Sequence, residues 1–384
     1  MQFIDLHAQR ARIETEINTA IARVLEHGMF VMGPEVKAFE AELADFSKAK
    51  HALGCANGTD ALALPLMAWG LKPGDAVFCP SFTFCATAEV VPWLGAEPVF
   101  VDILPDTYNM DPDHLEACIK AVQVEGRLTP KVIIAVDLFG QAADHEAMRK
   151  LADKYGMKLI ADSAQGFGTT IDGKHPSDWA DIVTTSFFPA KPLGCYGDGG
   201  AVLTNDDDLA ERIDSIRIHG KVTASDLKDQ TFEHDPKYFN MRIGMNSRLD
   251  TIQAAILSEK LKIFADEIQL RNKVADRYAE GLKDHVLAVP GTPDNVVSVW
   301  AQYVIDHENR DGLQAHLKAQ GVPSAVYYPV PMHVNGAYER FRSGAGNLTV
   351  TEDKMGKVLA LPMHPYLNES DQDKVISAVR SFNG

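Results

Sequence analysis

The stretch "PKVIIAVDLFGQAADHEAMRKLADKYGMKLIADSA", residues 130–164, decides the fold class of this chain. It opens and closes with short apolar runs, and between them lies an amphipathic segment that stops at Gly156. Short apolar runs on either side of such a segment are typical of buried parallel strands joined by a helix. We therefore predict strands within 130–140 and 158–164, with a helix over 144–156 between them.

The same alternation extends on both sides of that stretch. Four further apolar runs are predicted to be buried strands: "DAVFCP" at 75–80, "EPVFVDI" at 97–103, "DIVTTSFF" at 181–188 and "GAVLTN" at 200–205. Apolar residues at helical spacing predict one helix over 8–27 and another that begins after Gly33-Pro34. Strands that alternate with helices in this way predict an α/β fold with a mostly parallel central sheet flanked by helices.

The second half of the chain has a different pattern. The polar segment 221–238 predicts a mobile loop, and a long helical tract from about 249 to 282 is expected to break near Gly281. Beyond it, short apolar runs and helical patterns indicate a smaller α+β domain: 298–305, 311–321, 324–330 and 370–382. We predict a large cofactor-binding domain with an N-terminal helical segment over 1–250, and a linking helix with a small C-terminal domain over 251–384.

The charge balance argues against several kinds of partner. The sequence has 37 basic and 53 acidic residues, a net charge of −16, which disfavours nucleic acid and anionic membrane surfaces. No apolar run approaches the ~18 residues of a membrane span, and the charged start "MQFIDLHAQRARIETEI" is unlike a signal peptide. Five scattered cysteines without a CxxC pair fit a reducing compartment. We expect a cytoplasmic protein without nucleic-acid or membrane partners.

Several familiar catalytic motifs are absent from the sequence. There is no GxGxxG after a strand, no GxxxxGK[ST] phosphate loop and no GxSxG elbow. There is also no HExxH motif, and Cys79 and Cys85 have a poor spacing for zinc, so no metal site is expected. The chemistry has to come from other stretches.

Two stretches suit an anion and a flat ring. In "CANGTDALALPLMAWG", Asn57, Gly58 and Thr59 stand directly before an apolar helix, where free amides and a hydroxyl suit a phosphate. An ordinary helix N-cap is the alternative interpretation. In "PSFTFCATAEVV", Phe84 follows a predicted strand and is able to stack on a flat cofactor. Core packing is the alternative for this ring.

Two further stretches supply an acid and an amine. "KLIADSAQGFG" places Asp162 at the end of a buried strand, where it would meet a ring nitrogen or else cap the next turn, with Gln165 three residues on. In "TSFFPAKPLGCYGDGG", residues 185–200, Lys191 stands alone among glycines, prolines and aromatics, and Ser186 lies on the preceding strand. Poor hydration favours the neutral amine that attacks a carbonyl. A solvated loop lysine is the alternative.

The order of these four stretches decides between the alternatives. A helix start for phosphate, a stacking aromatic, a strand-end aspartate and a lysine loop follow one another on strand ends of one predicted sheet. They are the parts needed to hold pyridoxal phosphate, which requires an anchor, a cover for its ring, an acid and an amine. We predict pyridoxal 5'-phosphate as the cofactor.

The chain also resembles the DegT/DnrJ/StrS family of nucleotide-sugar aminotransferases over essentially its whole length. The stretches that carry the resemblance are "GPEVKAFE", "ANGTDAL", "FTFCATAEVV", "DSAQGFG", "SFFPAKPLGCYGDGGA", "IHG", "NSRLDTIQAAIL", "VYYPVPMH" and "LPMHPYL". The resemblance implies a fold-type I pyridoxal-phosphate transferase that works as a homodimer with active sites at the subunit interface.

The resemblance also implies roles for individual residues. Lys191 looks like the catalytic lysine that binds the aldehyde of the cofactor, and Asp162 like the partner of its pyridinium nitrogen. The other implied cofactor contacts are Gln165 near the phenolic oxygen, Phe84 over the ring, Gly58, Thr59 and Ser186 on the phosphate, and Asn246 on the phosphate from the neighbouring subunit. The implied substrate contacts are Arg248, for which a surface salt bridge is the alternative, and His333, for which a core histidine is the alternative.

The reaction implied by the resemblance is the transfer of the amino group of glutamate to a nucleotide-linked keto-sugar. "GCYGDGGA" is more similar to the branch that acts on 3-oxo sugars than to the 4-oxo branch. Within it, the chain is most similar to enzymes for UDP-linked 2-acetamido-3-amino sugars, made from a 3-oxo-glucose or 3-oxo-glucuronate for O-antigen or lipid A assembly. Three alternatives stay open: a 4-oxo or dTDP-linked 3-oxo substrate, a sugar dehydratase, which would have histidine in place of Lys191, and a non-catalytic regulatory or binding protein.

Overall fold

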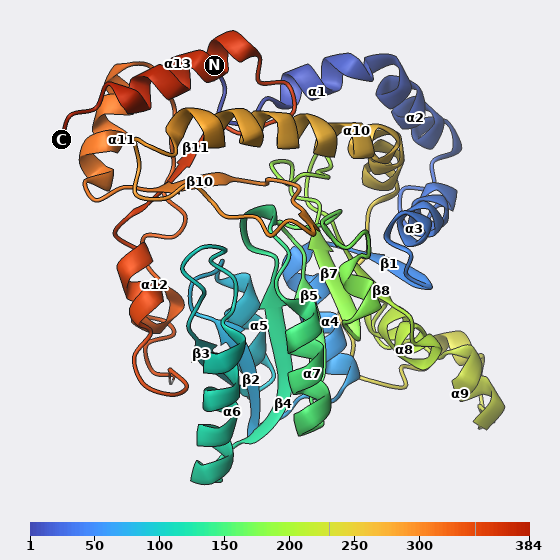
Figure 1. Cartoon of the computed structure of the whole chain (residues 1–384). Helices are drawn as coiled ribbons and strands as arrows, with labels where there is room; N and C mark the ends of the chain where they lie inside the picture. Colours follow the sequence, from blue (N-terminus) through green and yellow to red (C-terminus); the bar gives the residue numbers. More distant parts are fainter. Residues whose placement is uncertain (230, 342) are drawn as a thin grey trace.

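The computed structural model describes residues 1–229, 231–341 and 343–384 (Figure 1). Its centre is a seven-stranded sheet in the order β1-β8-β7-β5-β4-β2-β3. The strands are β1 His51–Cys55, β2 Asp75–Pro80, β3 Glu97–Val101, β4 Thr129–Val136, β5 Lys158–Asp162, β7 Ile182–Ser186 and β8 Gly200–Thr204. β3, β2, β4, β5 and β7 run parallel, and β8 pairs antiparallel with both β7 and β1. The prediction of a mostly parallel α/β sheet is confirmed.

Helices cover both faces of this sheet (Figure 1). The helices of the described residues are α1 Leu6–Arg12, α2 Glu14–His27, α3 Pro34–Ser47, α4 Gly58–Ala68, α5 Ala86–Trp93, α6 Pro112–Glu125, α7 His145–Tyr155, α8 Asp207–Ile216, α9 Ala224–Asp229, α10 Thr251–Leu282, α11 Arg310–Ala319, α12 Thr349–Lys354 and α13 Glu369–Arg380. Successive strand residues point to opposite faces. Val77 and Cys79 of β2 therefore pack in a core with α4, α5 and α8, while Ala76 and Phe78 pack with α6 and α7.

The C-terminal part of the chain forms a separate apolar core. The antiparallel pair β10 Tyr303–Asp306 and β11 Val358–Leu361 packs with α11, α13 and the second half of α10. A second short pair, β6 Thr170–Ile171 with β9 Val296–Val297, lies outside both sheets. In Figure 1, α10 runs across the upper part of the molecule, below α13 and α1, and it contacts both α3 and α13. The division between residues 250 and 251 stays a prediction.

Three local predictions differ from the structure. The helix predicted over 8–27 is two helices, because Ile13 leaves helical geometry and caps α1. The loop predicted at 221–238 is partly wrong, since it contains α9 and a 3-10 helix at Pro236–Tyr238; residue 230 of that loop lies outside the described residues. The Asp226 carboxylate accepts bonds from the amide and hydroxyl of Thr223, and this local pairing lets a polar segment begin a helix. α10 continues through Gly281 without the expected break.

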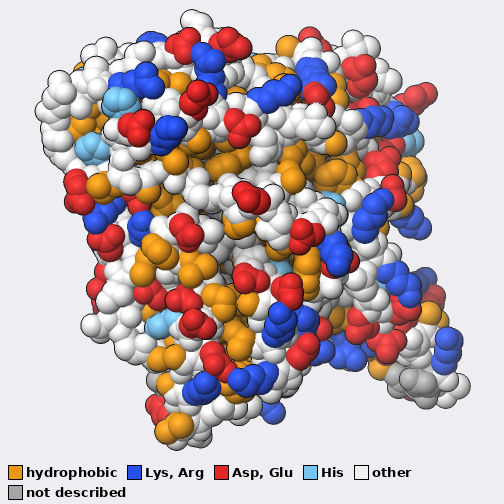
Figure 2. Space-filling model, viewed as in Figure 1, with side chains coloured by type: hydrophobic (Ala, Val, Ile, Leu, Met, Phe, Trp, Pro, Cys, Tyr) orange, Lys and Arg blue, Asp and Glu red, His pale blue; other side chains and the backbone are white. Residues whose placement is uncertain are grey.

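The surface agrees with the mixed composition. On the face shown in Figure 2, acidic and basic side chains are interspersed, and neither sign of charge forms a large patch there. Across residues 1–229, 231–341 and 343–384, no helix is both long and apolar enough to cross a bilayer. The same residues contain no cluster of three or more metal-type ligands.

Candidate active site

The predicted site residues come together at one edge of the sheet. β5 and β7 are parallel neighbours, and their carboxyl ends carry Asp162 and Ser186. The turn after β7 carries Lys191, and β8 leaves from the same edge, where Gly200 pairs with Ser186. Ligands of parallel sheets collect at this edge, because the loops and helix starts that follow the strands converge there.

The start of α4 is suited to an anion. Asn57 caps the helix, and its side-chain oxygen accepts a bond of 2.8 Å from the amide of Asp60. The amides of the first two helical residues, Gly58 and Thr59, have no acceptor within the helix. A Cβ on Gly58 would lie 2.6 Å from Cβ of Ser186, so the helix start touches the end of β7. The structure thus brings together the three residues that we predicted to bind phosphate.

Asp162 is a buried and oriented carboxylate. Only 4% of it is exposed, the hydroxyl of Thr87 donates to its Oδ2 at 2.8 Å, and the amide of Ala164 donates to Oδ1 at 3.2 Å. Burial raises the pKa of Asp162, while these two donors and the charge of Lys191 oppose that rise. Such a carboxyl group is suited to holding a proton together with a cationic ring nitrogen.

Lys191 is not a freely solvated surface lysine. It is only partly exposed, and its amide donates to the carbonyl of Phe188 at 2.8 Å, which closes the turn after β7. Burial lowers the pKa of Lys191 by disfavouring the ammonium form, and the negative charge of Asp162 opposes this change. A lowered pKa favours the neutral amine, which is the form of lysine that attacks a carbonyl.

Gln165 is held by bonds at both ends of its amide. Its Oε1 accepts a bond of 2.9 Å from the amide of Phe139, and its Nε2 donates 3.0 Å to the hydroxyl of Tyr328. Tyr328 comes from the C-terminal part of the chain, and burial raises its pKa, so its phenol stays neutral. The orientation of Gln165 is therefore set by residues far apart in the sequence, while its predicted contact with the cofactor stays a prediction.

Phe84 lies in the loop between β2 and α5 and is 52% exposed. An aromatic ring that exposed is not a packed core residue. The alternative interpretation from the sequence, core packing, is therefore wrong for Phe84. Its predicted position over the cofactor ring is not tested.

Residues 217–229 and 231–248 form a segment that we call the arm, and Asn246 and Arg248 lie at its base. Ile218 bridges to Asn246 at that base, and α9 at the far end of the arm projects from the body in Figure 1. Ser247, between the two predicted residues, is fully buried and accepts a bond of 3.2 Å from the amide of Ala56, just before the α4 cap. Asn246 is exposed and Arg248 is partly exposed, while Ser247 between them is buried.

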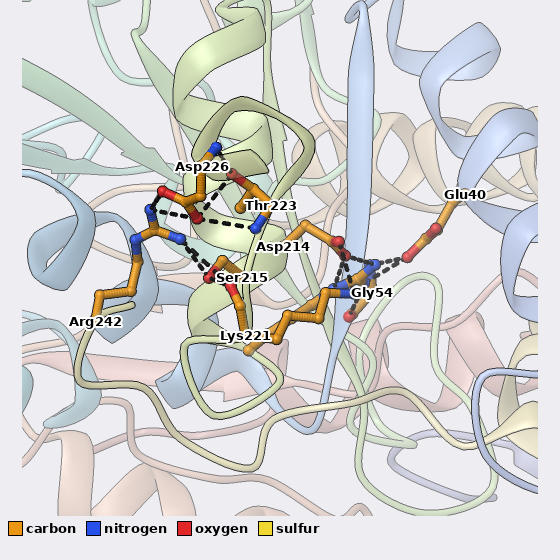
Figure 3. Close-up of polar contacts among 9 residues, drawn as sticks. Glu40, Gly54, Asp214, Ser215, Lys221, Thr223, Asp226 and Arg242 are labelled. Atoms are coloured by element: carbon orange, nitrogen blue, oxygen red, sulfur yellow. Dashed lines mark hydrogen bonds and ion pairs between the residues drawn. The ribbon is translucent and has the colours of Figure 1, made fainter. Parts of the chain in front are cut away.

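Polar contacts fix this arm to the body (Figure 3). Arg242 donates to Asp226 of α9 at 2.8 Å and to Ser215 of α8 at 2.6 Å. Arg217, also at the arm base, is 2% exposed and forms ion pairs with Glu40 at 2.5 Å and with Asp214 at 2.6 Å. These bonds hold the segment that carries Asn246 in a defined place.

His333 is anchored to the end of β2. The hydroxyl of Ser81 accepts a bond of 3.1 Å from the His333 amide and lies 2.7 Å from Nδ1 of the ring. Nε2 makes no well-aligned hydrogen bond, and Glu352 Oε1 lies 3.4 Å from it. The predicted substrate contact by His333 stays a prediction.

Four functional neighbours escaped the sequence analysis. Three set the orientation of predicted residues: Thr87 for Asp162, Tyr328 for Gln165, and Ser81 for His333. The fourth, Ser247, ties the arm to the phosphate-binding loop. Each contact joins positions more than 70 residues apart, so no local spacing indicates it.

The site residues fit pyridoxal phosphate. Two unpaired amides and a serine hydroxyl meet at a helix start where a Cβ on Gly58 would not fit, which suits a phosphate group. A buried carboxylate suits a cationic ring nitrogen, and a lysine of lowered pKa suits an aldehyde. These are the donors that we expect to hold the cofactor.

Comparison with known families agrees with this set. Residues 11–380 match the DegT/DnrJ/EryC1/StrS aminotransferase family. The chain belongs to this family. It is a pyridoxal-phosphate-dependent aminotransferase, and the predictions of family, cofactor and enzyme class are confirmed.

Similar curated relatives include enzymes and a regulator. The chain is 47% identical to the UDP-2-acetamido-2-deoxy-3-oxo-D-glucuronate aminotransferase of Pseudomonas aeruginosa, over 99% of each chain. It is 40% identical to the pleiotropic regulatory protein of Geobacillus stearothermophilus, over 99% of this chain and 97% of that protein. It is 37% identical to the dTDP-3-amino-3,4,6-trideoxy-alpha-D-glucose transaminase of Streptomyces venezuelae, over 99% of this chain and 95% of that one.

Solved structures confirm the fold. A DegT DnrJ EryC1 StrS aminotransferase from Brucella abortus superposes with a TM-score of 0.95 at 52% identity, covering both chains fully. DesV from S. venezuelae, in complex with a ketimine intermediate, gives 0.88 at 36% identity over 99% of this chain and 97% of that one. NtdA from Bacillus subtilis, with bound cofactor PMP, gives 0.83 at 29% identity over 98% and 82%.

Proposed function

We propose that this aminotransferase moves the amino group of glutamate to C3 of a nucleotide-linked 3-oxo sugar. The substrate class is UDP-2-acetamido-2-deoxy-3-oxo-glucose or its glucuronate, and the product is a 3-amino sugar for lipopolysaccharide, as O-antigen or lipid A. The named substrate of the P. aeruginosa relative supports this choice. One observation carries the proposal. Burial lowers the pKa of Lys191, and the charge of this lysine interacts with that of buried Asp162.

The chain's own residues have separate roles in this reaction. The cofactor, when bound, supplies the electron sink that stabilises a carbanion at the amino-bearing carbon. Asp162 holds the proton on the ring nitrogen, because Thr87 and the Ala164 amide keep its carboxylate oriented and partly charged. Gly58, Thr59 and Ser186 anchor the phosphate at the start of α4. Phe84 covers the ring, and Gln165 contacts its phenolic oxygen.

Lys191 is the proposed general base and acid. When it is not bonded to the cofactor, its amine would take the proton from the amino-bearing carbon of the substrate and would later give a proton back as the general acid. The lowered pKa keeps a larger fraction of the amine neutral at working pH, which is the form that accepts a proton. Arg248 is the proposed partner of a C6 carboxylate, through its two-pronged guanidinium, and His333 is a second proposed sugar contact.

Two copies of the chain are proposed to share their active sites. Asn246 is exposed, as a residue that reaches a neighbouring subunit would be, and it is Ser247 beside it that contacts the phosphate-binding loop of the same chain. Next to this segment, Val31 bridges to Asp250, and Met29, Phe30 and Val31 form a run of exposed apolar side chains. Contiguous exposed apolar side chains mark interaction surfaces. This surface is proposed to pack against the second copy.

Complementation tests the shared site. Lys191→Ala and Asn246→Ala proteins are each expected to lose activity. If Asn246 acts on the neighbouring site, unfolding and refolding the two proteins together restores activity, up to about a quarter of the parent value, because one intact site forms in each mixed dimer. No restoration in a mixture shown to contain mixed dimers would contradict sharing.

The remaining parts of the proposal rest on the sequence. The five free cysteines support a reducing compartment, so we propose that the enzyme works in the cytoplasm. The separate C-terminal core supports a small domain over 251–384, joined through α10.

Product analysis tests the proposed reaction. Protein loaded with pyridoxal phosphate is incubated with ¹⁵N-glutamate and a panel of UDP- and dTDP-linked 3-oxo and 4-oxo sugars, and products are identified by mass spectrometry. The expected result is ¹⁵N at C3 of a UDP-2-acetamido sugar, absent with Lys191→Ala. Preference for a 4-oxo or dTDP-linked sugar would replace the substrate, while the aminotransferase reaction would stand.

A non-catalytic role is the second candidate, since one relative is a regulatory protein at 40% identity. Protein that binds pyridoxal phosphate but transfers no ¹⁵N to any sugar of the panel would favour this role. A dehydratase is disfavoured by Lys191 itself.

A further inference from the structure

Lys260 of α10 is a buried cation that the proposed mechanism does not use. It is 1% exposed, its Nζ donates 2.6 Å to the carbonyl of Gly194, and it lies 4.2 Å from the ring centroid of Tyr196. Among the described residues, no carboxylate lies within 4 Å of its ammonium. A buried charge without an ion pair is costly, so the contacts that it makes with this loop need an explanation.

Those contacts lead directly to the catalytic lysine. Gly194 lies three residues after Lys191, and a Cβ built on Gly194 would be 2.5 Å from the carbonyl oxygen of Pro189 and 2.7 Å from that of Phe188. The Gly194 backbone therefore packs against the backbone of Phe188 and Pro189, which directly precedes Lys191. The carbonyl of Phe188 also accepts the amide of Lys191. A shift of Gly194 would move the backbone that carries the Lys191 side chain.

A second residue of α10 holds the same loop. The side chain of Gln253 accepts the amide of Tyr196 at 2.8 Å and donates to the Tyr196 carbonyl at 3.3 Å. Gln253 and Lys260 are two turns apart on α10, so the helix makes hydrogen bonds to the loop at two nearby residues, Tyr196 and Gly194. Lys260 is the only one of the two that carries a charge.

We propose that Lys260 is a positioning residue for the catalytic lysine: its ammonium, on the Gly194 carbonyl and the Tyr196 ring, holds the 191–196 loop so that the Lys191 amine faces Asp162. This inference rests on the proposed role of Lys191. Cation–ring contacts are strongest when the cation is removed from water, and a charged donor strengthens the bond to the carbonyl. A neutral side chain of the same length lacks both.

The grip depends on pH. Burial lowers the pKa of Lys260 to about 8, and the charges of Glu267 and the Cys195 thiol oppose that fall. Arg10 of α1 acts on Tyr196, and Asp198 acts on the Cys195 thiol, so these two charged groups also bear on the cluster. Because the pKa of Lys260 in the folded protein is below that of a free lysine, its side chain is a charged ammonium that binds the loop below about pH 8 and is neutral above that pH. The loop is therefore expected to loosen on the alkaline side.

Hydrogen exchange in the apoprotein tests the loop without relying on activity. In Lys260→Met, the amides of Lys191, Cys195 and Tyr196 are expected to exchange about 10- to 100-fold faster, the effect of losing a bond to a charged donor. The matched control is Lys262→Met on the same helix, whose exposed side chain pairs with Glu259. Parental exchange rates in Lys260→Met would overturn the proposal.

Steady-state kinetics of the loaded enzyme give a second readout. Lys260→Met is expected to lower kcat about 10-fold or more at unchanged KM for the sugar, and Lys260→Arg, which keeps the charge, is expected to recover part of it. A variant that raises KM alone would contradict positioning of Lys191.

The parent protein alone supplies a test if the substituted proteins do not fold. After correction for intrinsic exchange, protection of the three loop amides is expected to fall between pH 7 and pH 9, while that of β5 stays constant. Equal protection at both pH values would overturn the proposal. Borohydride labelling of Lys191 in the same samples reports separately on the proposed function, since a label elsewhere would remove the role of Lys191 whatever the loop does.

Discussion

Replacing Gly58 with alanine is the sharpest perturbation of the phosphate site. The added Cβ would lie 2.6 Å from Cβ of Ser186, 3.0 Å from its Oγ and 3.2 Å from its Cα. No real Cβ sits that close, and Ser186 cannot retreat easily, because its strand is paired with β5 on one side and β8 on the other. The start of α4 has to move away from the end of β7.

The magnitude follows from the cost of overpacking. Forcing an extra carbon into a packed position costs about 1–3 kcal/mol. If the phosphate requires the helix start in its present place, the affinity for pyridoxal phosphate falls about 5- to 150-fold. Titration of apoprotein, followed by the absorbance of the bound cofactor, measures this loss.

Two comparisons isolate the phosphate. Binding of pyridoxal, which lacks the phosphate, is expected to change much less in Gly58→Ala. Gly356→Ala is the matched substitution, because its Cβ would meet only the Asp353 carbonyl at 3.8 Å. Parental affinity for pyridoxal phosphate in a folded Gly58→Ala protein would refute the assignment of this helix start.

Three further predictions concern Asp162, the arm and the C-terminal core. Thr87→Val removes the donor to Asp162, so the pKa of that carboxyl rises; the acid limb of the pH–kcat profile should move up and kcat at neutral pH should fall about 10- to 100-fold. Arg217→Met removes a buried guanidinium that pairs with the partly buried carboxylates of Glu40 and Asp214, and should lower the free energy of unfolding in urea by about 1.5–3 kcal/mol. The expected loss is less than about 1 kcal/mol for Arg277→Met, whose ion pair with Asp373 lies at the surface. Burial lowers the pKa of His364 to about 4. Between pH 6.5 and 4 the unfolded chain therefore binds more protons than the folded chain, and the free energy of unfolding decreases as the pH is lowered through this range. In His364→Leu, urea unfolding at pH 7 and 4.5 should show a smaller difference than in the parent.

The central strands could be predicted because burial on both faces makes them continuously apolar. β2 occupies residues 75–80 as predicted. β3, β5, β7 and β8 lie within their predicted stretches, and β4 begins one residue before its own. β1 was missed, because "HALGC" is at the edge of the sheet and mixes partly exposed with buried positions. The six-residue helix α9 was missed because polar bonds, rather than an apolar face, stabilise it.

The site could be predicted only as far as single residues reveal chemistry. Asp162 and Ser186 end strands, and Gly58 begins a helix, so their positions follow from the fold. Their partners do not, because contacts such as Gln165 with Tyr328 depend on how the C-terminal part docks on the sheet edge. No pattern along the chain encodes that docking.

The central claim is that the Lys191 amine binds the aldehyde of the cofactor. Holoenzyme is treated with borohydride, which fixes the cofactor to the amine that holds it, then digested and mapped by mass spectrometry. The pyridoxyl mass is predicted on the peptide that contains Lys191, and on no peptide of the Lys191→Ala protein. The same mass on a peptide around another lysine, or none on a fully loaded parent enzyme, would contradict the account.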